Sequence, residues 1–318
     1  MIYLTFMNRD VRQSDLSLSP AETVADCIKQ IETFALQEFD RQIQRHRLYY
    51  HTRDHIRQVQ RRSRLIFDAV RPHLDPASVP HIEQLLDLCV IAHDMVQVFE
   101  AQPQPHAARS RSAGVSETAT IDRLLDYIDA HNATQFSDQD RATIQAAIGA
   151  TICAYDAQEQ SIYQPSLNQP NLPIVARILA LADLGALGID GIEMYNREGS
   201  LLFLEENLDV IPLILNGSIH TLETTDATLA RNIQQRLLKR CRFQVKFAKS
   251  RMARFDQEIA GFPEASIETL RYPVFKYLNP VTLQELEATT PIDDTASLAV
   301  LLRFFDLDRY LKTPDSDA

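Results

Sequence analysis

Apolar residues recur at helical spacing along most of the chain, and capping residues separate the periodic segments. Residues 19–22 read SPAE, the order of a capping box with proline at the first helical position. A helix is therefore expected from there to about Asp40. A second helix is expected to begin near Tyr50 and to turn four apolar residues inward, namely Ile56, Val59, Ile66 and Val70.

The following segments keep the same period. A helix is expected over about residues 80–99, and its residues 85–90 are apolar nearly all round, which places it deep in the fold. Serines that can serve as N-caps precede two of the later periodic segments. Further helices are expected over 116–131, 137–155, 173–187 and 227–259, with loops over 101–114 and 156–171.

Glycine is scarce, which favours an all-α protein. The chain has 8 glycines in 318 residues, about 2.5%, against a usual share of roughly 7%. So few turn residues argue against a many-stranded sandwich, and there is no glycine-rich loop of the kind that cradles phosphates. An apolar fraction of 45% indicates a folded protein with a sizeable core.

Charge and cysteine content narrow the partners and the compartment. With 32 basic and 43 acidic residues, the net charge of −11 disfavours binding to a nucleic-acid duplex, although a small phosphorylated ligand could bind in a locally basic pocket. The four cysteines form no CxxC pair, which is typical of reduced thiols in a cytoplasmic protein. The first residues, MIYLTFMNRD, lack the pattern of a signal peptide. The longest apolar stretch (174–189) is too short to span a membrane, so no membrane partner is expected.

Three histidines and two carboxylates stand out as candidate chemistry. His51 and His55 are four residues apart, about 40° round a helix axis and about 6 Å along it, so they share one face. His93 and Asp94 lie in an apolar segment, and so does Asp183. A buried charge needs a partner, and a metal ion would supply one.

This donor set suits a divalent metal but does not choose among Mn²⁺, Fe²⁺, Mg²⁺, Zn²⁺ and Ni²⁺. Open coordination positions would hold water, whose pKa the metal would lower. Each residue taken singly could instead be a hydrogen-bonded core residue, and a site that binds ligand without turnover also stays open. A zincin is excluded, because its glutamate after the first histidine is replaced by Thr52.

The order of these motifs resembles the HD superfamily of metal-dependent phosphohydrolases, in particular its small bacterial members. Residues 50–56 (YHTRDHI) resemble the family's Tyr-His-Asn-x-x-His signature, His93-Asp94 matches the doublet that names the family, and Asp183 matches the last ligand. The match covers about residues 46–190. It implies an HD-type core (46–200), flanked by an N-terminal helical segment (1–45) and a C-terminal helical extension (201–318).

The resemblance also implies roles and an activity. His55, His93, Asp94 and Asp183 would hold one divalent metal. Asp94 would also orient the attacking water, His51 would protonate the leaving oxygen, and Glu117 would position water, since Ser116-Glu117 resembles the family's Asn-Glu element. The implied activity is that of a metal-dependent phosphatase or phosphodiesterase acting on a small phosphate compound, with nucleotides among the candidates.

Two loop arginines, Arg109 and Arg111, follow the doublet and could bind a phosphate, although solvated surface arginines would give the same sequence. Departures from the family pattern are Thr52 in place of asparagine and Gln97 or Val98 in place of a tyrosine. Members with two metals carry extra histidines, which the segment 144–155 lacks, so one metal is expected. His106 and His131 could substitute, and His81 less readily.

Two alternatives to hydrolysis remain. The first is a catalytically silent regulatory or ligand-binding protein of the same fold, which would use residues 201–318 to bind a protein partner or a second copy of the chain. The second is an oxygenase of the same fold with two irons, which the lack of extra histidines in residues 144–155 disfavours.

Overall fold

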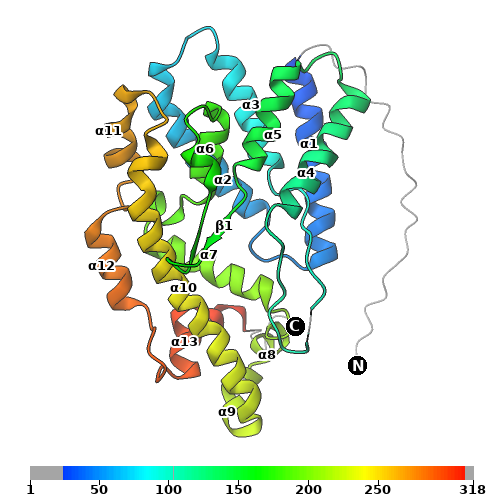
Figure 1. The fold of residues 1–318 in the computed structure, drawn as a ribbon. Helices are drawn as coiled ribbons and strands as arrows, with labels where there is room; N and C mark the ends of the chain where they lie inside the picture. Colours follow the sequence, from blue (N-terminus) through cyan, green and yellow to red (C-terminus); the bar gives the residue numbers. More distant parts are fainter. Residues whose placement is uncertain (1–23, 103, 312–318) are drawn as a thin grey trace, which may run out of the picture.

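Helices form most of the computed structural model, which describes residues 24–102 and 104–311 (Figure 1). Within these ranges the one sheet is an antiparallel hairpin of β1 (Ala154–Asp156) and β2 (Ser161–Tyr163). The expected all-α class is confirmed. In the described part of the chain, no helix combines the length and the apolar character that a membrane span requires.

Six helices of the first half surround one apolar core, and α6 lies against three of them. They are α1 (Val24–His46), α2 (Arg53–Val70), α3 (Val79–Ala92), α4 (Val115–His131), α5 (Asp138–Gly149) and α6 (Ile174–Asp183). Helix α6 contacts α2, α3 and α5. The four apolar residues expected to point inward from α2 are buried, as predicted.

The second half is organised around one long helix. Its helices are α7 (Ile192–Glu206), α8 (Ile211–Leu215), α9 (Leu222–Thr225), α10 (Ala227–Ile259), α11 (Ile267–Thr269), α12 (Pro280–Thr289) and α13 (Leu298–Phe304). The expected bounds of α10 are confirmed, and it runs past α7, α12 and α13 (Figure 1). Phe255 and Ile259 near its end belong to the core of the first half.

Short 3₁₀ and π turns connect these helices. They are η1 (Arg71–His73), η2 (Pro165–Asn168), η3 (Ala186–Asp190), η4 (Ser218–Thr221), η5 (Glu264–Ser266), η6 (Leu270–Val274) and η7 (Leu307–Tyr310). Two of them, η3 and η6, have the wider π geometry.

A fully buried arginine joins α2 to the second half. Arg62 donates to Asp190 in η3 through Nε (2.7 Å) and to Glu198 in α7. Burial opposes its charge, but the two carboxylates raise the pKa of the Arg62 guanidinium. Removing one partner of a buried ion pair usually costs about 3–5 kcal/mol, so this link holds α2 and α7 in fixed register.

Several predicted helix ends were wrong. Helix α1 ends at His46 rather than Asp40, and its expected capping box lies outside the described residues. Helix α5 ends at Gly149, because the chain then forms the β1–β2 hairpin. Helix α6 ends at Asp183, and Gly188 lies inside the following π turn.

The prediction for residues 80–99 was also wrong at its end, because side chains of α4 replace the helical hydrogen bonds. The N–H groups of Val96 and Val98 donate to the hydroxyls of Thr120 (3.0 Å) and Ser116 (3.1 Å). Ser116, expected as an N-cap, is therefore engaged in this contact and lies inside α4. The chain after α3 is thus held against α4 by side chains.

Gly188→Ala is expected to lower the free energy of unfolding by about 1–3 kcal/mol, the usual cost of overpacking. An added Cβ would lie 2.7 Å from Cδ1 of Phe275, which is buried and has little room to move. The matched control is Gly149→Ala at the end of α5, where an added Cβ meets no described atom within 4 Å. Urea unfolding measures both, and equal effects would contradict the packing argument.

Candidate metal centre

Three helices bring four possible metal ligands to one point. His55 comes from the first turn of α2, His93 is the C-cap of α3, Asp94 follows it, and Asp183 is the last residue of α6. One ligand atom from each residue lies within 4.8 Å of all the others. The packing of α6 against α2 and α3 therefore assembles the cluster from segments far apart in sequence.

The imidazole nitrogens and the carboxylate oxygens face one another without forming ordinary hydrogen bonds. His55 Nε2 lies 3.2 Å from Asp94 Oδ2 and 3.4 Å from Asp183 Oδ1. His93 Nε2 lies 3.1 Å and 3.8 Å from the same two oxygens. Yet among the described residues, neither nitrogen of His55 nor Nε2 of His93 has a hydrogen-bond partner. Four donor atoms that converge in this way fit a shared cation.

Neighbouring groups help to orient three of the four side chains. Gln164 Nε2 donates to Asp183 Oδ2 (3.4 Å), and two further contacts hold His93 and Asp94. His93 Nδ1 donates to the Val90 carbonyl (2.8 Å), which leaves Nε2 unprotonated toward the cluster in the neutral ring. The Gln97 amide donates to Asp94 Oδ1 (3.3 Å) and leaves Oδ2 for the cluster. Supporting bonds of this kind commonly orient metal ligands.

The cluster's electrostatics require positive charge. Burial alone would lower the pKa of the His55 imidazole, but Asp183 and Asp94 outweigh it and raise that pKa. Burial would raise the pKa of the Asp183 carboxyl, but His55 and His93 lower it to about 2. The carboxylates therefore stay ionised, and the site takes up either protons or a metal cation.

The cluster is open on its carboxylate side. The imidazoles of His55 and His93 are almost completely buried, whereas the side chains of Asp94 and Asp183 each keep 15% of their surface exposed. A catalytic metal site needs such an open position for water or substrate, whereas a structural site is closed by protein ligands.

His51 lies at the rim of the cluster and is bound to a residue that sequence reasoning missed. Its Nε2 lies 3.8 Å from Asp94 Oδ2, and its Nδ1 lies 2.5 Å from Oε1 of Glu205 in α7. Burial opposes ionisation of Glu205, but His51 and Arg111 help to lower its pKa to about 2. Glu205 adjoins Glu206 in a helix of mixed composition, so no local signal marks it.

The two loop arginines have different surroundings. Arg111 Nη1 lies 3.1 Å from His51 Nε2 and also donates to Gln97 Oε1, so Arg111 borders the cluster. Arg109 instead donates to the carbonyls of Glu205 (2.6 Å) and His46 (2.7 Å). These carbonyls are at the C-terminal ends of α7 and α1, where a positive charge is favourable.

Glu117 is electrostatically coupled to the same cluster. Burial raises the pKa of its carboxyl, and the charges of Asp94 and Asp183 raise it further, while Arg111 opposes them. Glu117 is half-buried in the first turn of α4. It therefore lies within electrostatic range of the possible ligands without being one of them.

The other histidines considered as ligands have partners elsewhere. His81 contacts Asp140 (2.6 Å), His106 contacts Asp209 (3.1 Å), and His131 Nδ1 donates to the carbonyl of residue 127 (2.9 Å). In the described part of the chain, the cluster of possible ligands includes none of them.

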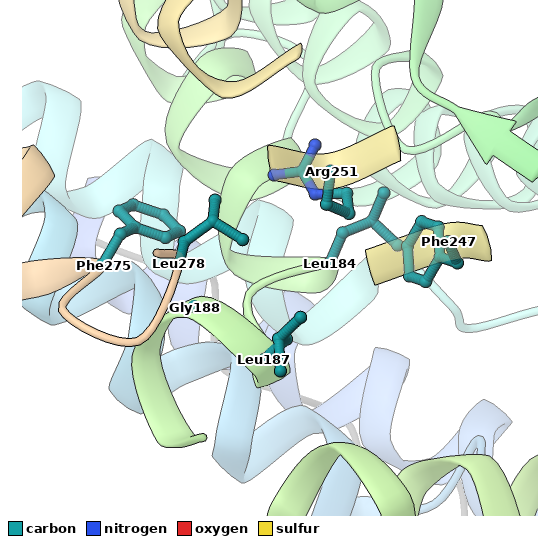
Figure 2. Close-up of a pocket in the computed structure, with 7 residues that line it drawn as sticks. All are labelled: Leu184, Leu187, Gly188, Phe247, Arg251, Phe275 and Leu278. Atoms are coloured by element: carbon teal, nitrogen blue, oxygen red, sulfur yellow. The ribbon is translucent and has the colours of Figure 1, made fainter. Parts of the chain in front are cut away.

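A pocket lies near the end of α6 but has a different character (Figure 2). Its lining is apolar apart from one arginine and comprises Leu184, Leu187, Gly188, Phe247, Arg251, Phe275 and Leu278. Arg251 is paired with Glu258 and is buried. The candidate ligands lie outside this lining.

A comparison with protein-family models, with curated proteins and with solved structures finds no match to this chain.

Metal binding to the cluster is expected to weaken as the pH falls. The pKa values of His55 and His93 are raised in the metal-free protein, so protons occupy the ligand nitrogens and compete with the metal. Because these two pKa values are raised by folding, protonation of the histidines also stabilises the metal-free fold at pH values below the pKa of a histidine in the unfolded chain. This stabilisation is lost as the pH rises through the raised pKa values of the folded protein. Calorimetric titration with Mn²⁺ or Zn²⁺ at about pH 6 and about pH 8 measures the change.

The matched variants for that titration are Asp183→Asn and Asp54→Asn. Asp54 is an exposed residue of α2 whose ion pair with Arg57 is on the surface, so its change should leave metal binding intact. Asp183→Asn should abolish binding. Binding that is equally tight in both variants would show that the metal is held elsewhere.

Proposed function

We propose that this protein is a metal-dependent phosphohydrolase acting on a small phosphate ester or phosphodiester, with nucleotides among the candidate substrates. The observation that carries the proposal is the convergence of His55, His93, Asp94 and Asp183 with imidazole nitrogens that lack hydrogen bonds in the described structure. The order of the same residues along the chain resembles the HD superfamily, whose expected core here is residues 46–200, and this resemblance also supports the proposal.

The donor set fits one divalent cation, and Mn²⁺, Fe²⁺, Mg²⁺, Zn²⁺ and Ni²⁺ are all compatible with it. Such a metal, when bound, would polarise a phosphoryl oxygen and lower the pKa of a water molecule. The partly exposed carboxylates of Asp94 and Asp183 leave room for both beside the ligands.

The surrounding residues supply binding and proton transfer. Arg111 borders the cluster and would bind phosphoryl oxygens by two parallel hydrogen bonds. His51 Nε2 faces the same space and would protonate the leaving oxygen. Asp94 and Glu117 would orient the attacking water.

Asp94→Asn is expected to lose bound metal and phosphohydrolase activity together, because the removed charge is shared by both histidines. The measurement is metal content by plasma mass spectrometry, beside turnover of a panel of phosphate monoesters and diesters. Asp54→Asn again serves as the exposed control and should keep both properties. Activity that survives in Asp94→Asn would overturn the proposal, and bound metal without turnover on the whole panel would favour the regulatory alternative.

Arg111→Ala is expected to raise KM by about tenfold to a few hundredfold while metal content stays unchanged, because a charged hydrogen bond contributes about 1.5–3 kcal/mol. Its contacts are with His51 and Gln97 rather than with the ligand atoms of the cluster. Steady-state kinetics on the best ester of the panel measures the effect. An unchanged KM would remove Arg111 from substrate binding.

A further inference from the structure

Glu205 is a buried carboxylate that belongs to the second half of the chain but binds the turn that carries His51. Only 1% of the residue is exposed. Its Oε2 accepts the backbone N–H groups of Tyr49 (3.0 Å), Tyr50 (3.0 Å) and His51 (3.1 Å). Its Oε1 contacts His51 Nδ1 at 2.5 Å. All four contacts are made by one side chain to three consecutive residues.

The Glu205 backbone is held as firmly as its side chain. Arg109 Nε donates to the Glu205 carbonyl (2.6 Å), and the Arg109 N–H donates to the next carbonyl, that of Glu206 (2.8 Å). The same guanidinium lies 3.7 Å over the ring of Phe99. The carboxylate therefore has little freedom to leave His51.

These contacts determine which ring nitrogen of His51 carries the proton. An ionised carboxylate can only accept hydrogen bonds, so His51 Nδ1 must carry a proton and donate it in the hydrogen bond to Glu205. On the other side, the nearest group to Nε2 is Arg111 Nη1 (3.1 Å), and a guanidinium cannot accept a hydrogen bond. Asp94 Oδ2 is 3.8 Å from Nε2, beyond hydrogen-bond distance. Nδ1 is thus the protonated atom, and Nε2 faces the metal cluster.

We propose that Glu205 is a positioning residue that keeps a proton on Nδ1 of His51, so that Nε2 is the atom that exchanges a proton with the substrate. This inference rests on the proposed function and adds a residue from the C-terminal extension to the site. Carboxylate–histidine pairs fix the tautomer and stabilise the charged imidazolium in other hydrolytic sites.

The proton balance of the step is simple. The oxygen of the attacking water bonds to phosphorus, and the bond from phosphorus to the leaving oxygen breaks with its electron pair on that oxygen. His51 enters the step as an imidazolium, with one proton held on Nδ1 by Glu205 and a second on Nε2. The leaving oxygen takes the proton from His51 Nε2. A proton released by the attacking water restores the ring, so that the net reaction is hydrolysis, and Nδ1 keeps its proton on Glu205 throughout.

The decisive variant is Glu205→Gln, which keeps the shape of the side chain and removes its charge. Three backbone N–H groups need an acceptor, so the amide oxygen should turn toward them. The amide NH₂ then faces Nδ1 and donates to it, which forces the proton of the ring onto Nε2. The matched control is Glu206→Gln, whose side chain binds Arg240 (2.6 Å) away from His51.

The first readout does not require turnover. Proton–nitrogen correlation spectra of histidine-labelled protein with Zn²⁺ bound, at one neutral pH, should show a proton on Nδ1 of His51, identified by its loss in His51→Ala. Glu205→Gln should lose that proton, and Glu206→Gln should keep it. A His51 Nδ1 without a proton in the unmodified protein would overturn the inference, even if the proposed function itself had failed in the ester panel.

The second readout uses kinetics and a double-mutant cycle. Glu205→Gln should lower kcat by about 10²- to 10⁴-fold for phenyl phosphate, the usual contribution of general acid catalysis, with metal content unchanged. The loss should be much smaller for p-nitrophenyl phosphate, whose leaving oxygen needs no proton. In a His51→Ala background, Glu205→Gln should cause no further loss. Equal losses with both esters, or a full loss in that background, would mean that Glu205 only stabilises the fold.

Discussion

The arrangement of the helices around the candidate site depends on positive charge between two neighbouring carboxylates, those of Asp94 and Asp183. Asp94 and Asp183 offer oxygens within 4.8 Å of one another, largely removed from solvent. Two ionised carboxylates this close repel each other strongly in a low dielectric. The imidazoles of His55 and His93 are aimed between them, and only a proton or a metal cation there makes the arrangement stable. The convergence of α2, α3 and α6 is thus inseparable from the charge that they enclose.

A second set of ionic contacts holds the turn before α2 from the opposite side. Glu205 takes up the backbone donors of that turn, and Arg62 ties the same helix to Asp190 and Glu198. Burying these charges is costly unless every partner is present. The network therefore specifies one position of α7 against α2, and that position places His51 beside the carboxylate side of the cluster.

Local signals predicted what depends on local chemistry. The bounds of α10 and the serine N-cap of α5, which is Ser137, follow from neighbouring residues in sequence, and both were confirmed. The end of α3 was not predictable, because Thr120 and Ser116 on another helix replace its hydrogen bonds. Within the site, His93, Asp94 and Asp183 were identified as polar residues in apolar segments, and His55 by its spacing from His51 and by the family resemblance. Glu205 has no such mark, since it is indistinguishable from Glu206 until the fold brings it to His51.

The expected boundary at residue 200 between the core and the C-terminal extension separates His51 from Glu205, which binds its imidazole. The apolar cluster formed by α7, α8, α10 and α13 packs against Tyr49, next to the turn that Glu205 binds. Arg109 joins the ends of α1 and α7 from a loop that belongs to neither. The helices after residue 200 are therefore part of the support of His51. The His51–Glu205 contact is the point at which these helices reach the candidate site, and it involves none of the four possible metal ligands.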